Sequence, residues 1–267
     1  MTCRTFRPQW IRSGYVGGIS PSRYPSKVSI RRPFYGSRMR SDVPGKAVAE
    51  FVGAFALIFA GAGSIIATQG HNLVAIALAH GLAIGVMASA VGHISGGHFN
   101  PAITFGFLVT RKIKPALAVV YWIAQFAGAV VAALMLSWLL PQAQVNNVQL
   151  GVPALGPGIS GGQGIVIEGI LTFFLVWVVF ACAADPDGAF KLVAGLAIGF
   201  TISLDIFVGG PYTGAAMNPA RAFGPELVQN VWSNWWVWYI GPLVGGALAA
   251  LAYEVLYLRT RRAETAA

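Results

Sequence analysis

The chain has 267 residues, of which 56% are hydrophobic and only 10% are charged, whereas soluble domains carry about 25% charged residues. These proportions, with a mean hydropathy of +0.65, exclude an ordinary soluble domain and indicate a protein with several membrane-spanning helices. The net charge of +9 comes from the first 46 residues, which hold ten basic residues and one acidic residue. Because the rest of the chain is neutral, this charge does not favour nucleic-acid binding.

Residues 1–44 form a basic tail rich in Arg, Ser, Pro, Tyr and Gly. The tail lacks the apolar stretch of a cleavable secretory signal. Three interpretations remain open: an organelle-targeting segment, a disordered cytoplasmic tail, or sequence upstream of the true start, since Met39 stands just before the first apolar run. Of these, we predict a disordered cytoplasmic tail over 1–44, and we predict a second, short cytoplasmic tail over 259–267.

Six apolar runs follow, each close to the roughly 20 residues that a helix needs to cross a bilayer. They cover about 47–67, 73–93, 115–138, 165–184, 190–210 and 235–257. Two shorter runs, about 100–109 and 218–228, give helices of roughly 15 Å, which can enter a membrane but cannot cross it. The sequence therefore predicts an all-α membrane protein with six transmembrane helices and two re-entrant half-helices.

Basic residues between the runs indicate the orientation of the chain. With six spans, one side of the membrane receives Lys46, Arg111, Lys112, Lys114, Lys191, Arg259, Arg261 and Arg262. The opposite side has only Arg221, and its long loop 141–163 carries no charge. Since basic loops stay in the cytoplasm, we expect both termini to be cytoplasmic, in the cell (plasma or inner) membrane.

The most informative feature is a motif that occurs twice, as HFNPAITFG over 98–106 and as AMNPARAFG over 216–224. The same offset of 118 residues relates Glu50 to Glu168. The channel domain we predict over 45–258 thus consists of two repeats, 45–140 and 163–258. Each repeat has three spans, so the second enters the membrane inverted, and the two half-helices meet near the midplane.

Asn-Pro-Ala is a compact signal to begin a helix, because Asn is a favoured N-cap and Pro is favoured at the first helical position. Two helix N-termini that face each other place about half a positive charge each at mid-membrane. That field repels cations and protons but accepts a neutral dipole. We therefore predict a pore centre at Asn100, Ala102, Asn218 and Ala220, with the two Asn amides offering N–H donors to a passing oxygen.

Two ionisable groups near the motifs bear on the pore. Arg221 lies in the first turn of its half-helix, where the first repeat has Ile103. A cation there is costly at membrane depth, so we expect it to line the pore mouth rather than to reach for the surface. His98 could line the inner vestibule and respond to pH, or could equally be a structural histidine.

Acidic residues within the spans are the main evidence for a different mechanism. Glu50 and Glu168 could carry protons in a coupled transporter. Their symmetry favours a structural role instead, in which each accepts hydrogen bonds from backbone N–H groups of its own re-entrant loop. Asp205 has no acidic counterpart in the first repeat, where Met87 stands, and the sequence suggests no function for it. The four histidines and two cysteines are too dispersed to predict a metal site.

Three segments together resemble the aquaporin, or major intrinsic protein, family: SGGHFNPA over 95–102, GAAMNPARAFGP over 214–225 and AEF over 49–51. The resemblance extends over about 45–258. It implies one pore in each subunit of a homotetramer in a lipid bilayer, with no cofactor. An enzyme is not favoured, because the chain shows no nucleophile with an adjacent base and no phosphate-binding loop.

The resemblance also implies a selectivity filter at His80, Ile206, Ala215 and Arg221. This set is similar to the plant vacuolar (tonoplast) pattern, whereas strict water channels of the family have Phe and His at the first two positions. Glycerol-conducting members usually have Asp after the filter Arg, and here Ala222 stands there. Because Ile206 stands where strict water channels have a second ring, and because Ala215 is small, the pore mouth should be wider and one of its walls should be apolar.

We therefore predict a passive channel for water that also conducts ammonia, urea and hydrogen peroxide, with glycerol an open case, and that excludes protons and ions. Two alternatives remain: a proton- or ion-coupled secondary transporter built on inverted repeats, and a structural membrane protein with a closed pore.

Overall fold

The structure is a computed structural model, and we describe its residues 43–188 and 193–260. The tail predicted over 1–44 lies outside these ranges except for its last two residues, which begin the first helix. Residues 261–267 lie outside them as well, as does most of the second predicted tail. Every regular element in the described ranges is helical.

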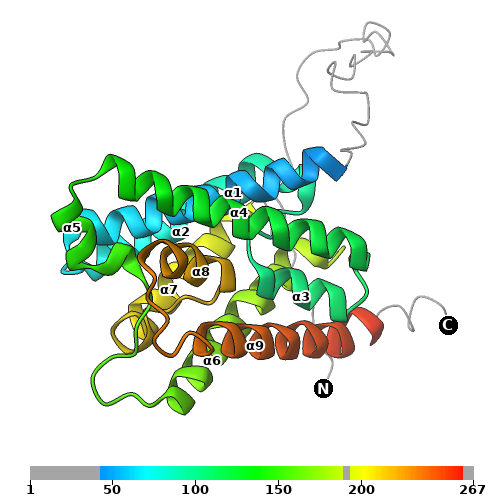
Figure 1. The fold of residues 1–267 in the computed structure, drawn as a ribbon. Helices are drawn as coiled ribbons and strands as arrows, with labels where there is room; N and C mark the ends of the chain where they lie inside the picture. Colours follow the sequence, from blue (N-terminus) through cyan, green and yellow to red (C-terminus); the bar gives the residue numbers. More distant parts are fainter. Residues whose placement is uncertain (1–42, 189–192, 261–267) are drawn as a thin grey trace, which may run out of the picture. The chain divides into compact units, whose positions relative to one another are not determined.

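Six helices are long and apolar enough to cross a membrane, as the sequence predicted. They are α1 (Val43–Thr68), α2 (Leu73–Ser95), α4 (Pro115–Leu139), α6 (Gly161–Val179), α7 (Ala194–Thr213) and α9 (Val237–Tyr253) (Figure 1). The fourth and the sixth continue into π-helical turns, η3 (Phe180–Ala184) and η5 (Glu254–Arg259). Their outward faces carry exposed apolar side chains, such as Ile123 at 65% and Trp138 at 76%, which suits contact with lipid rather than water.

The two half-helices begin at the repeated motif. They are α3 (Pro101–Val109) and α8 (Pro219–Gln229). Asn100 and Asn218 have extended backbones, and each side chain caps its helix by accepting a hydrogen bond from the N–H of the alanine two residues later, at 2.8 and 3.0 Å. The local signals therefore fix both helix starts where the sequence predicted them.

The helices pack as two inverted halves. Helix α1 packs on α2 and α4, and the equivalent α6 packs on α7 and α9. Helices α2 and α7 join the halves, and each half-helix packs mainly on the last spanning helix of the other half, α3 on α9 and α8 on α4 (Figure 1). Neither half-helix is therefore positioned by its own repeat alone.

The α2–α7 contact depends on glycine. A Cβ at Gly81 would lie 2.4 Å from the carbonyl oxygen of Gly199, and a Cβ at Gly199 would lie 2.3 Å from that of Gly81. The Ser203 hydroxyl also donates to the carbonyl of Ala77 across the contact, at 2.9 Å. Two backbones can approach this closely only without side chains between them.

The long loop 141–163 contains structure that the sequence did not predict. It holds a short helix, α5 (Gln142–Asn147), and a 3₁₀ turn, η2 (Gln149–Gly151). The side chains of Val145 and Leu150 are fully buried, and η2 packs against α1 and α8. The loop therefore folds inward over the end of α8 instead of extending away from it.

Candidate functional site: a narrow cavity between the half-helices

A narrow cavity lies between the two halves and collects most of the predicted site residues. Its lining consists of Leu57, His80, Ile84, His98, Asn100, Ile103, Leu175, Ile202, Ile206, Ala215, Ala216, Met217, Asn218 and Arg221. Only about 20 Å³ of it can hold the centre of a water-sized sphere. This space is close to what one water molecule needs, so any solute at this point must pass in single file.

The two motif asparagines bind each other's loops. The side-chain amide of Asn100 donates to the carbonyl of Met217 at 2.8 Å, and the amide of Asn218 donates to the carbonyl of Phe99 at 3.0 Å. Each side-chain oxygen is already used as a helix cap. Because an amide carries two N–H donors, one donor of each asparagine is committed to the opposite half and one remains for a solute. The hydrogen bonds to the opposite half were not part of the sequence prediction.

Ala102 and Ala220 lie beside the cavity and do not line it. Both are buried, with exposed fractions of 0% and 1%, and neither belongs to the lining. Their backbone N–H groups instead receive the asparagine caps. The two alanines therefore support the half-helix starts, and of the four predicted pore-centre residues the two asparagines belong to the cavity lining.

Glu50 holds the loop before α3. One carboxylate oxygen accepts from the Ser95 hydroxyl at 2.6 Å and from the His98 N–H at 2.9 Å. The other accepts from the Phe99 N–H at 2.6 Å and from the Gln125 amide at 2.8 Å. The carboxylate is fully buried and satisfied by four donors.

Glu168 does the same for the loop before α8. It accepts from the Thr213 hydroxyl and from the backbone N–H groups of Ala216 and Met217, at 2.7, 2.9 and 2.7 Å. The backbone of Met217 is left-handed, with φ of 52°, as is that of Phe99 at 50°. Such conformations are costly outside glycine, and the carboxylates stabilise them by accepting the N–H groups that the turns present.

His80 and Arg221 supply the polar part of the predicted filter. The Nδ1 of His80 lies 2.8 Å from the carbonyl of Ile76, so Nδ1 carries the proton and Nε2 is left as an acceptor. Arg221 is 3% exposed and donates from Nη1 to the carbonyl of Gly151 at 2.8 Å, while its Nε has no partner among the described residues. The guanidinium is thus held within the protein and does not reach the surface.

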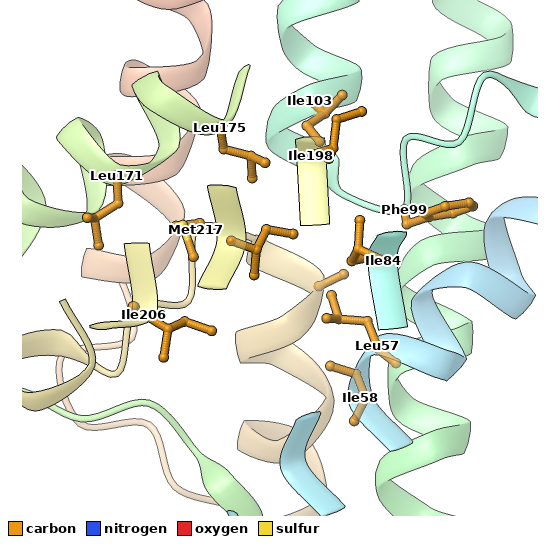
Figure 2. Packing of buried hydrophobic residues seen from close by; sticks show 14 of the residues in the cluster. Leu57, Ile58, Ile84, Phe99, Ile103, Leu171, Leu175, Ile198, Ile206 and Met217 are labelled. Carbon is orange, nitrogen blue, oxygen red and sulfur yellow. The ribbon is translucent and has the colours of Figure 1, made fainter. Parts of the chain in front are cut away.

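The remaining walls are apolar. Ile206 and Ala215, the other two predicted filter residues, line the cavity with Leu57, Ile84 and Leu175. Figure 2 shows Leu57, Ile84 and Ile206 extending from different helices toward the same region. A solute therefore meets both hydrogen-bonding groups and hydrocarbon along the cavity wall.

His98 lies on the cavity wall and is held there. Its Nδ1 is 3.0 Å from the Thr104 hydroxyl oxygen, and its ring centre is 4.4 Å from that of Phe107 and 5.2 Å from that of Tyr121. These contacts hold the ring in place, as the structural alternative expects, and a response of His98 to pH stays a prediction.

Three further groups lie near the site and have no function assigned from the sequence. Asp205 is 2% exposed, lies outside the cavity lining, and has one carboxylate oxygen without a hydrogen bond among the described residues. Glu226 in α8 is also buried and accepts from the Tyr239 hydroxyl at 2.8 Å. The carbonyl of Gly151, which anchors Arg221, has no signature in a sequence because every residue has a carbonyl. Among the described residues, no group of three or more metal-ligating side chains occurs.

Comparison with known proteins agrees with this geometry. The profile of the family described as "Major intrinsic protein" matches residues 38–253. The chain belongs to the major intrinsic protein family. As a member of that family with six spanning helices, it is a multi-pass integral membrane protein.

Individual relatives of this major intrinsic protein cover most of its length. It is 41% identical to "Aquaporin TIP1-2" of Zea mays, over 88% of this chain and 94% of the relative. It is 44% identical to "Probable aquaporin TIP3-2" of Arabidopsis thaliana, over 79% and 83%. Among solved structures, the aquaglyceroporin from Plasmodium falciparum is similar with a TM-score of 0.75 at 24% identity, over 82% of this chain and 98% of that one. This last likeness concerns the fold alone.

Proposed function

We propose that this protein is a passive channel for water and other small neutral solutes. The observation that carries the proposal is the narrow cavity in which two half-helix N-termini meet and whose wall holds Asn100, Asn218, His80 and Arg221. Relatives named aquaporins, similar over most of the chain, support it.

The electrostatics of the cavity favour neutral solutes. The N-termini of α3 and α8 each contribute about half a positive charge, and the Arg221 guanidinium adds a full one. Cations and hydronium are therefore repelled. A water molecule can exchange its hydrogen bonds for those of polar groups on the cavity wall, among them the free asparagine N–H groups.

The composition of the filter favours a range of solutes wider than water. Ile206 and Ala215 add apolar surface to the lining that also holds His80 and Arg221. We propose that ammonia, urea and hydrogen peroxide pass as well, and we regard glycerol as the upper limit to be tested.

Proteoliposomes provide the decisive experiment. Stopped-flow light scattering would measure water, urea and glycerol flux side by side, with entrapped dyes for ammonia, peroxide and protons. We expect rapid water flux, measurable urea, ammonia and peroxide flux, and no proton flux. Water flux alone would overturn the wider solute range, and well-folded protein without water flux would overturn the channel itself.

Glu50 and Glu168 give the coupled-transporter alternative no support, because every carboxylate oxygen of both accepts hydrogen bonds from the protein. Saturable uptake that depends on a proton gradient would nevertheless favour that alternative. The same assay therefore separates the two mechanisms.

We also propose a homotetramer with both termini in the cytoplasm, to be tested by native mass measurement and by protease access to tags. The membrane is a separate question. The expected location was the cell membrane, but the relatives carry tonoplast-type names, which oppose that assignment. Imaging of a fluorescent fusion would show which membrane holds the protein.

A further inference from the structure

Gly61 lies in α1 directly behind the imidazole of His80. A Cβ built on Gly61 would lie 2.4 Å from both Nε2 and Cδ2 of His80 and 2.8 Å from Cε1, whereas real Cβ atoms essentially never approach another heavy atom closer than 3.0 Å. The backbone itself does not require glycine here, since Gly61 is inside a helix and has no positive φ. The ring occupies the space that a side chain at this position would take.

We propose that Gly61 is a positioning residue for the filter: by having no side chain, it lets the His80 ring sit back against α1 and so sets the width of the pore. The inference rests on the channel function proposed above. Gly61 does not line the cavity, whereas His80 does. The effect of Gly61 on a solute is therefore exerted through the ring.

The direction of the effect follows from how the ring is held. Nδ1 is bound at 2.8 Å to the Ile76 carbonyl of the same helix, which fixes the inner end of the imidazole. With α1 behind the distal edge, the open direction is the lumen. A methyl group at position 61 must move that edge by about 1 Å to reach ordinary contact at 3.4 Å, in a passage whose free space holds about one water molecule.

The repeat supports a link between this glycine and the ring. The positions 118 residues later are Val179 for Gly61 and Ile198 for His80. Both are buried in the equivalent helices, α6 and α7. The first helix of the second repeat therefore accommodates a branched side chain at the position equivalent to Gly61. Glycine stands at this position only in the repeat that carries His80.

The test compares Gly61→Ala with a matched control two residues along the same helix. A Cβ at Gly63 would meet only Leu136, at an ordinary 3.4 Å, so Gly63→Ala should leave flux unchanged. We expect Gly61→Ala to lower the ratio of urea to water permeability by about tenfold, the usual scale for one methyl group in a fitted pocket. Permeabilities would be measured in proteoliposomes and normalised to the amount of folded protein.

The His80→Ala background distinguishes positioning from general damage to packing. Without the ring, a methyl group at position 61 has nothing to displace, so Gly61→Ala/His80→Ala should match His80→Ala in both permeabilities. An unchanged ratio in folded Gly61→Ala would overturn the inference. The inference would also be overturned if His80→Ala folds and conducts but the double variant fails to fold or has a lower permeability than His80→Ala. If Gly61→Ala alone fails to fold, recovery in the double variant supports the inference.

Failure of the proposed function would be seen separately. If wild-type protein passes water but no urea, the solute range proposed above is wrong, and the Gly61 test is read from water permeability instead. Gly61→Ala should then lower water flux relative to Gly63→Ala, and the double variant should restore it. If wild-type protein conducts neither solute, the channel function fails before the variants are compared.

Discussion

Replacing Glu168 with glutamine separates a structural role for this acid from a proton-carrying one. One carboxylate oxygen accepts from Thr213 and Ala216, and the other accepts from Met217. Glutamine keeps the shape but has only one oxygen. The new amide can be oriented in two ways. In one, its NH₂ group faces the backbone N–H of Ala216, and in the other it faces that of Met217, so one of these two N–H groups always loses its acceptor.

The expected cost follows from that lost bond. A hydrogen bond to a charged group contributes about 1.5–3 kcal/mol, and the donor is left buried without a partner. Ala216 and Met217 are only 5% and 2% exposed, so water does not replace the acceptor. We expect the free energy of unfolding to fall by about 2–3 kcal/mol, which corresponds to a melting midpoint lower by roughly 5–10 °C.

The assay is thermal unfolding in detergent, followed by fluorescence-detected gel filtration, together with water flux in liposomes. Thr172→Val is a suitable control, because the Thr172 hydroxyl bonds only a carbonyl of its own helix, that of Glu168, at 2.7 Å. It should shift the midpoint by less than half as much. A Glu168→Gln midpoint equal to that of wild type would refute the structural role, and loss of proton-dependent uptake at unchanged stability would point to coupled transport.

Three further predictions concern the cavity wall. Ile206→His combined with Ala215→Cys should add a ring and bulk to the filter, and the ratios of urea and ammonia flux to water flux should fall; unchanged ratios would contradict the filter assignment. Arg221→Ala removes a positive charge and the hydrogen bond to the Gly151 carbonyl. Urea flux should therefore rise, and a pH-sensitive dye in the vesicles should report a proton leak. A proton permeability equal to that of wild type would show that the guanidinium is not part of the barrier to protons. Asn218→Asp replaces the N–H donor that faces the Phe99 carbonyl with a carboxylate oxygen, so that two acceptors face each other. The lost hydrogen bond should cost about 2 kcal/mol, visible as a lower melting midpoint and contradicted by an unchanged one.

The half-helices and their caps could be predicted from the sequence because the signals that define them are local. Asn100 and Asn218 each cap a helix through a hydrogen bond that spans two residues. The offset of 118 residues then related one half to the other without any knowledge of packing. The symmetric glutamates followed from the same offset, and their hydrogen bonds to the re-entrant loops are present in the structure.

Contacts between distant backbone groups could not be predicted in this way. The Gly151 carbonyl binds Arg221 across 70 residues, and the asparagine amides bind carbonyls 117 and 119 residues away. A carbonyl belongs to every residue, so neither its type nor its spacing marks it. The same limit explains why the buried turn at Leu150 was expected to be a plain outer loop.

The exchange of hydrogen bonds between the two motif loops has a consequence for biosynthesis. The acceptor for Asn100 is the carbonyl of Met217, so the first half of the chain cannot complete its own pore centre while the second half is still being translated. A ribosome must deliver more than a hundred further residues to the membrane before the two loops can close on each other. The permeation path is thus finished late in synthesis. We expect the two repeats, expressed as separate chains, to conduct only when both are present.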